Sequence, residues 1–211
     1  MEMRSQLYMF ASGLFNQPTL ARLHMLRGLL AQLTQAKPAE APWGDTLVAL
    51  ETKLDYDEEM EAEYSRLFIL AFPSQPVQPF GSYWLENDQR LFGESTLEIK
   101  NMMAEHGIEV ADNTGLLPDH LVSELEFMAY LAGLDETTHQ TQQKLLEQHL
   151  ALWTPQFTEA LRAANPAYHY RLAADFLDQL ITWDMQNLFH ILAHDEQANI
   201  TATSYGESKN S

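Results

Sequence analysis

The chain has 211 residues, of which 45% are hydrophobic, and a chain of this size can bury one sizeable core. Its 30 acidic and 12 basic residues leave a formal charge of −18, which argues against nucleic acid or an anionic membrane as a partner, since both attract cationic surfaces. The absence of cysteine excludes disulfides, thiolate metal sites and a cysteine nucleophile.

Apolar residues recur at helical spacing along most of the chain, and no stretch sustains the two-residue alternation of a strand. Asp45 is a candidate N-cap, and Ser95 with Glu98 forms a capping-box pattern. In chain order, helices are predicted over residues 2–15, 19–35, 45–54, 57–71, 95–106, 118–134, 135–153, 155–165 and 168–194. The expected fold is all-α, a single globular domain of roughly eight or more helices over residues 1–195, followed by a polar tail over residues 196–211.

Two features of the sequence indicate where the chain acts. The chain has no run of 18 apolar residues, which a membrane-spanning helix requires. Its first 15 residues lack the basic start, apolar middle and small-residue cleavage site of a secretory signal. A cytoplasmic protein without membrane insertion is therefore expected.

A proline-rich loop precedes the most apolar helix. Prolines within residues 72–81 disfavour helix at their own positions and just before them, so this segment is expected to be non-helical. The end of this loop overlaps the string Pro79-Phe-Gly-Ser-Tyr-Trp84, in which large rings flank a glycine that lets the backbone turn. Apolar rings with a few oriented polar groups suit the capture of a peptide.

The predicted helix over residues 118–134 begins with a second distinctive string, Leu117-Pro-Asp-His120. Pro118 suits the first position of a helix, and Asp119 then lies in the first turn, where the helix dipole favours an anion. The following residues are apolar over most of the helix circumference, as expected at the centre of a helical domain.

Ser82, Asp119 and His120 supply the residue types of a hydrolase triad. Asp119 and His120, however, are neighbours on a predicted helix, where successive side chains do not face each other. Ser82 also lacks the strand–turn–helix context of an esterase nucleophile. Because phosphate-binding glycine loops are absent as well, we expect binding rather than catalysis, with no cofactor.

A metal-dependent, all-helical enzyme is the alternative from another functional class. Its ligands would be His120, Glu124, His190 and His194, which form two pairs at the spacing of one helix face. Di-metal four-helix proteins need two Glu-x-x-His strings, and this chain has only the one at residues 136–139. Stoichiometric zinc, iron or manganese in the purified protein would favour this alternative.

Several strings in the right order resemble the TorD/DmsD family, the cytoplasmic chaperones that mature molybdenum-cofactor oxidoreductases before export. These strings are Glu63-Tyr-Ser-Arg-Leu-Phe68, Pro79-Phe-Gly-Ser-Tyr-Trp-Leu85, Leu91-Phe-Gly-Glu-Ser-Thr96 and Pro118-Asp-His-Leu121. The second and third are more similar to the DmsD branch, which serves dimethyl sulfoxide reductase, than to the TorD branch, which serves trimethylamine N-oxide reductase.

The resemblance implies a non-enzymatic chaperone that binds the twin-arginine signal peptide of an exported molybdoenzyme and delays its export until maturation. A monomer and a domain-swapped homodimer are both compatible with it. By position, the resemblance assigns signal-peptide binding to Pro79, Phe80, Gly81, Ser82, Trp84, Leu117, Pro118, Asp119 and His120. Such a peptide has a cationic start and an apolar middle, which an acidic body with an apolar groove would complement.

Overall fold

The computed structural model describes residues 3–37, 40–54, 58–70, 77–111, 115–134 and 136–207, with side chains up to residue 188 except those of residues 58 and 136. The described helices are α1 (Met3–Phe15), α2 (Leu20–Ala36), α3 (Gly44–Glu51), α4 (Glu58–Tyr64), α5 (Gly81–Leu85), α6 (Glu94–Glu105), α7 (Leu121–Ala132), α8 (His139–Leu145), α9 (Ala151–Ala163) and α10 (Tyr168–Glu207). A π-helical turn, η1 (Ser65–Ile69), continues α4, and another, η4 (Leu146–Leu150), joins α8 to α9. The prediction of an all-α fold with eight or more helices is confirmed.

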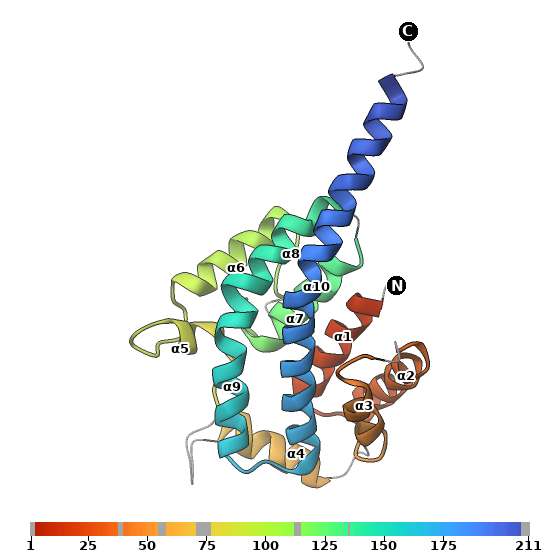
Figure 1. Ribbon diagram of the computed structural model, residues 1–211. Helices are drawn as coiled ribbons and strands as arrows, with labels where there is room; N and C mark the ends of the chain where they lie inside the picture. Colours follow the sequence, from red (N-terminus) through yellow and green to blue (C-terminus); the bar gives the residue numbers. More distant parts are fainter. Residues whose placement is uncertain are drawn as a thin grey trace.

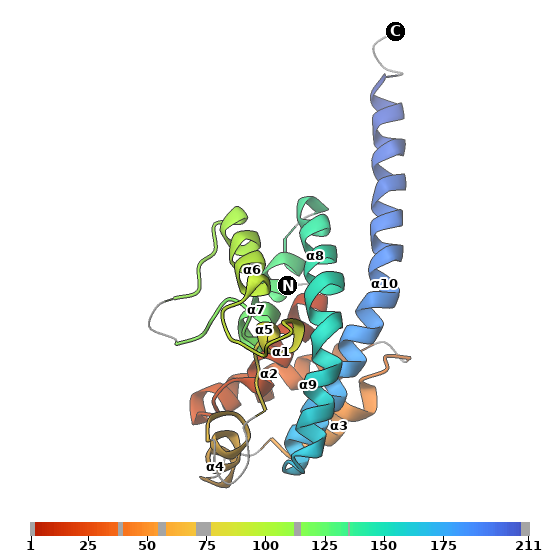
Figure 2. The ribbon, with the colours of Figure 1, turned by 90° about the vertical axis from the view of Figure 1, so that its left-hand side faces the viewer.

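Helix α7 lies at the centre of the molecule and packs most extensively against α1, while α9 packs along α10 (Figure 1). Leu121, Leu125 and Met128 of α7 have no exposed surface, as its nearly continuous apolar sequence predicts. Seen from the side, α6 and α7 lie on one flank and α10 on the other (Figure 2). Helix α7 therefore packs between α1 and α8, its main partners in the core.

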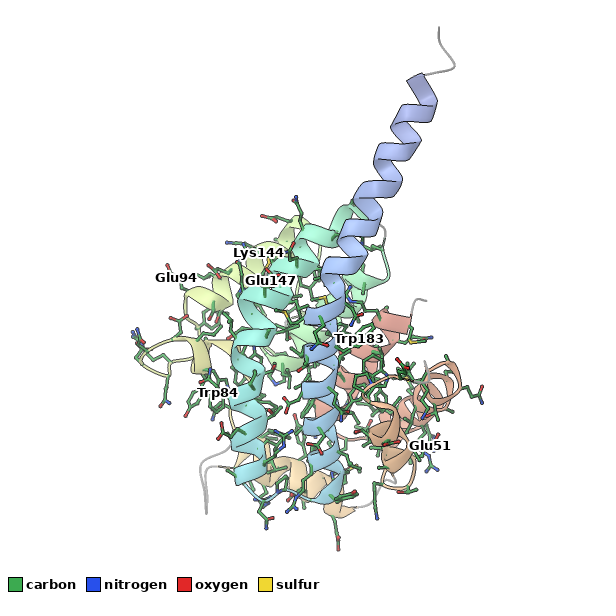
Figure 3. The ribbon with its side chains drawn as sticks, in the orientation of Figure 1. Glu51, Trp84, Glu94, Lys144, Glu147 and Trp183 are labelled. Atoms are coloured by element: carbon green, nitrogen blue, oxygen red, sulfur yellow. The ribbon has the colours of Figure 1, made fainter. Side chains whose placement is uncertain are left out.

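Aromatic pairs connect the N-terminal helices to α10. The rings of Phe10 and Phe176 meet edge to face with centroids 5.3 Å apart. Trp183, labelled on α10 in Figure 3, packs edge to face against Trp43 with centroids 4.8 Å apart. Edge-to-face contacts of this kind stabilise beyond the area that they bury.

A buried ion pair fastens α1 to α10. The guanidinium of Arg4 binds Asp184 through two hydrogen bonds of 2.6 and 2.7 Å, and the Tyr8 hydroxyl donates to the same carboxylate at 2.6 Å. Arg4 also donates to the side-chain carbonyl of Gln142 on α8. Asp184 is fully buried, so its charge depends on these partners.

Two predicted helix caps are wrong. The N-cap position of α3 is Trp43, and Asp45 lies in the first turn. Helix α6 begins at Glu94 after an N-cap at Gly93, so the expected capping box of Ser95 does not form. Instead, the backbone N–H and hydroxyl of Ser95 both donate to Glu86, at 3.1 and 3.0 Å. A carboxylate from outside the helix has taken the capping role.

Three helix boundaries also differ from the sequence prediction. Helix α7 begins at Leu121 rather than at residue 118, and α10 continues to Glu207 instead of ending near residue 194. The expected break before Pro155 is absent, because η4 carries the chain from α8 into α9 and Pro155 lies within α9. No helix in these described ranges is long and apolar enough to cross a membrane.

We expect Asp184→Asn to lower the free energy of unfolding by about 3 kcal/mol, because it leaves the Arg4 charge buried without its partner. Urea unfolding followed by circular dichroism measures this loss. The control is Asp175→Asn on the same helix, whose carboxylate is 47% exposed and pairs with Arg162 at the surface. That variant is expected to lose less than about 1 kcal/mol. Equal losses in the two variants would contradict the assignment.

Candidate functional site

The two distinctive strings of the sequence meet in space. Phe80 and His120 form an isolated antiparallel bridge between residues 79–82 and residues 119–121. Two backbone hydrogen bonds flank the bridge, from the Gly81 N–H to the Asp119 carbonyl at 2.8 Å and from the Leu121 N–H to the Pro79 carbonyl at 2.8 Å. We refer to these two paired segments as the junction. The structure therefore brings together seven of the nine predicted site residues, apart from Trp84 and Leu117, in or directly beside one feature.

Asp119 is fully buried at the junction. One of its carboxylate oxygens accepts a hydrogen bond from the backbone N–H of Ser82 at 2.9 Å. Ser82 lies in the first turn of α5, whose N-cap residue Phe80 makes no side-chain cap of its own. The placement of Asp119 in the first turn of its own helix is therefore wrong: its carboxylate caps α5, because α7 begins two residues later.

His120 is the N-cap residue of α7. Its Nδ1 atom accepts a hydrogen bond from the Val122 N–H at 3.1 Å, and its ring meets Phe80 edge to face at 5.0 Å. Burial lowers the pKa of His120 to about 4, although the neighbouring Asp119 opposes this shift. The imidazole is therefore neutral near pH 7, as an accepting Nδ1 requires.

A buried polar pair lies behind the junction. Glu124 of α7 is fully buried, and its carboxylate is 3.5 Å from the indole Nε1 of Trp153 on α9. Burial, reinforced by Asp119, raises the pKa of Glu124 well above its usual range. Gly81 lies against this pair, since a Cβ there would be 3.0 Å from Glu124 and 3.2 Å from Trp153. Close approach, rather than turn geometry, requires glycine at this position.

The described side chains at the junction form neither a hydrolase triad nor a metal site. The Asp119 carboxylate binds the Ser82 amide, and His120 Nδ1 binds the Val122 amide, so neither completes a hydrolase triad. Within the described side chains, no group of three or more His, Asp or Glu residues is placed to hold a metal ion. His190 and His194 of the metal alternative lie outside those side chains.

A largely apolar groove begins beside the junction, on the flank that carries α6 and α7 in Figure 2. It consists of two adjoining hollows of about 410 and 290 Å³, formed by α6, α7 and the segments 108–111 and 115–118. We call it the α6–α7 groove. Its apolar lining consists of Phe92, Met103, Ala104, Ile108, Val110, Ala111, Leu116, Leu117, Pro118 and Phe127. Leu117 and Pro118 are the two predicted site residues that line it.

Most of the groove was missed by sequence reasoning. Ile108 and Val110 are apolar residues in a connection that no predicted helix includes, and this was the available signal. Phe92 is a second signal, because it belongs to a family-like string but was not placed in the site. Its ring is 63% exposed, and its backbone φ of 72° lies in the left-handed region that a bulky residue rarely adopts. Such strain is typical of functional positions.

The remaining predicted residues anchor the loop. Pro79 is buried, while Trp84 is half-buried on α5 beside α9 (Figure 3). The Trp84 indole donates to the Gln78 carbonyl at 2.8 Å, which ties α5 to the strand-like segment before it. Pro73 and Pro76 of the proline-rich loop lie outside the described residues.

The fold defines an all-helical protein in which a backbone bridge joins the two candidate site segments. A family model described as nitrate reductase delta subunit matches residues 14–159. The chain belongs to this nitrate reductase delta subunit family, and the resemblance to TorD and DmsD is confirmed by its relatives.

The relatives include both branches. The Tat proofreading chaperone DmsD of Salmonella typhimurium is 34% identical over 123 residues, which cover 57% of this chain and 59% of that protein. The chaperone protein TorD of Vibrio cholerae is 26% identical over 202 residues, covering 84% of this chain and 90% of that protein. The match thus spans less than two thirds of the DmsD relatives. A solved structure described as a redox enzyme maturation protein from Archaeoglobus fulgidus shares the fold, with a TM-score of 0.58, 23% identity and coverage of 85% of this chain and 94% of that one.

We expect Gly81→Ala to destabilise the protein by about 1–3 kcal/mol, because the added methyl group overlaps the buried Glu124 and Trp153. Gly28→Ala is the matched control, since nothing lies within 4 Å of its Cβ and alanine favours a helix interior, by about 0.5–1 kcal/mol. Urea unfolding measures both free energies. The close-approach argument fails if the two substitutions have the same sign.

His120→Asn keeps an N-cap acceptor but removes the titrating ring. In the wild type the folded pKa lies below the unfolded value of 6.5, so the unfolded state binds more protons between about pH 4 and 6.5. Stability therefore falls as the pH drops through this window, by about 2 kcal/mol between pH 7 and 5. Urea unfolding at several pH values should show a flatter profile for the variant. Parallel profiles would show that His120 is not responsible.

Proposed function

We propose that this chain is a cytoplasmic chaperone that binds the twin-arginine signal peptide of an exported molybdenum-cofactor oxidoreductase and delays export until the cofactor is in place. The names of its relatives, Tat proofreading chaperone DmsD and chaperone protein TorD, support this role. It is a binding role that requires no catalysis and no cofactor. The single observation that carries it is the apolar α6–α7 groove beside the junction.

The chemistry of the groove matches the apolar middle of a signal peptide. Its larger hollow, about 410 Å³, is within the size range of ligand pockets and is walled mainly by aliphatic and aromatic side chains. A signal peptide also begins with a cationic segment. The net charge of −18 attracts such a segment and accelerates its encounter with the protein, and salt weakens this attraction over about 8 Å at physiological ionic strength.

The predicted site residues divide into two roles. Leu117 and Pro118 line the groove and contact the peptide. Asp119 and His120 are buried, so they position the peptide-contacting segment through the caps that they make at α5 and α7. The other segment of the junction belongs to the same support and contains Pro79, Phe80, Gly81 and Ser82. Trp84 on α5 adds to this support.

The client is a finer part of the proposal. The strings Gly81-Ser-Tyr-Trp-Leu85 and Leu91-Phe-Gly-Glu-Ser-Thr96 favour a precursor of the dimethyl sulfoxide reductase type. The matches to TorD make a trimethylamine N-oxide reductase precursor the competing client. Calorimetric titration with the two signal peptides distinguishes them, because the true client should bind more tightly.

Phe92→Asn tests the groove directly. Losing an exposed ring that the peptide covers should weaken binding of the dimethyl sulfoxide reductase signal peptide by at least about tenfold, in line with about 1.5–3 kcal/mol for burying such a side chain. The melting temperature should stay the same or rise, since asparagine tolerates the positive φ. Isothermal titration calorimetry and thermal unfolding measure the two effects.

Leu152→Asn is the control, because Leu152 is 53% exposed on α9 and does not line the groove. Its affinity for the peptide should match that of the wild type. Unchanged binding in Phe92→Asn, or failure of the wild-type protein to bind either signal peptide, would contradict the proposal.

A further inference from the structure

We propose that the signal peptide lies in the α6–α7 groove in a single direction. Its arginines sit at the α7 end against Glu126 and Glu109, and its apolar segment then runs toward Phe92. This inference rests on the proposed function and deepens it, because it names the groups that recognise the arginines and the order in which the peptide meets the groove.

Neither the buried Asp119 of the junction nor the buried Glu124 behind it is suited to receive an arginine. Asp119 has no exposed surface, and its carboxylate already accepts a hydrogen bond from the Ser82 amide. Glu124 is equally buried, and the upward shift of its pKa keeps it protonated to a higher pH than a surface glutamate. A guanidinium would have to lose its hydration to reach either group. The recognising carboxylates must therefore lie at the surface.

Two exposed carboxylates border the groove. Glu109 lines both of its hollows, and Glu126 of α7 lines the smaller one, of about 290 Å³. Glu126 is oriented by Ser12 of α1, whose hydroxyl donates to one carboxylate oxygen at 3.0 Å. An arginine can bind a carboxylate with two donors at once, so the pair offers a binding place for adjacent arginines.

The opposite end of the groove carries the opposite charge. Lys100 of α6 lines the larger hollow, together with Phe92 and Leu117, but not the smaller one. A lysine there repels the cationic start of a signal peptide and leaves the apolar hollow to its middle segment. The groove is thus asymmetric along its length, and only one direction of a peptide that is cationic at one end matches it.

A positive charge on the other side of Glu126 further restricts where the arginines of the peptide can bind. Beyond α7, Glu126 also borders a separate hollow of about 110 Å³, which is lined by Met25, Leu29 and Arg22. Arg22 disfavours a second cation there. The arginines of the peptide are therefore expected on the groove side of Glu126, next to Glu109.

A double-mutant cycle tests the charge recognition. Glu126→Gln and Glu109→Gln should each weaken binding of the wild-type signal peptide about two- to fivefold, the usual range for exposed ion pairs. Neither substitution should change the affinity for a peptide in which both arginines are replaced by glutamine. Lys100→Gln should bind the wild-type peptide as tightly as the unmodified protein or more tightly. Isothermal titration calorimetry at low salt gives all of these affinities.

Glu159→Gln is the matched control, since Glu159 is an exposed carboxylate on α9 outside the groove, and its removal changes the net charge equally. No arginine-dependent loss is expected from it. An equal loss in this control would assign the effect to the overall charge of the protein and overturn the proposed carboxylate pair.

The direction is read by photo-crosslinking. A crosslinker placed before the arginines should label α7 near Glu126, and one at the far end of the apolar segment should label the region of Phe92 and Leu117. Mass spectrometry of the products locates the labels. A reversed pattern, with wild-type affinity intact, overturns the direction and leaves the proposed function standing. Absence of binding between the wild-type protein and peptide overturns the proposed function itself.

Discussion

The junction depends on a helix whose first N–H groups are satisfied from elsewhere in the chain. Helix α5 has only five residues and no side-chain cap from its own N-cap residue, so its first N–H groups, which lack partners within the helix, need acceptors from elsewhere. Asp119 supplies them from 37 residues away, through its carboxylate on Ser82 and its carbonyl on Gly81. The same stretch of chain then caps α7 with His120. One short segment thus sets the relative position of α5, α7 and the wall of the groove.

This arrangement separates groups that hold the site from groups that can meet a ligand. The holding groups are buried: His120 is neutral at pH 7, Glu124 is held toward its protonated form, and the Asp119 carboxylate accepts a hydrogen bond from the Ser82 amide. Charge and apolar surface are instead displayed outward, on Glu126 and Lys100 at the groove and on the strained, exposed ring of Phe92. These buried groups are fixed by packing and hydrogen bonds, so the electrostatic response to an approaching cation falls mainly on the exposed charges.

This fold occurs in another protein at low sequence identity. The Archaeoglobus fulgidus structure shares it at 23% identity, which leaves most surface positions free to differ. Core helices such as α7 can keep their packing with many combinations of apolar residues. Leu116 and Leu117 of the groove are only half-buried, so residues at these positions can change with less effect on the core.

The sequence by itself determined the all-α fold, the burial of α7 and the family, because helical periodicity and short strings are local properties. It also identified Asp119 and His120 as residues of note. Only the tertiary structure decided what they do, since the partner of Asp119 lies 37 residues away and Gly81 is required by the approach of Trp153 from another helix. The groove was hidden for the same reason: Ile108 and Val110 line a common wall with α6 and α7 only once those helices have packed.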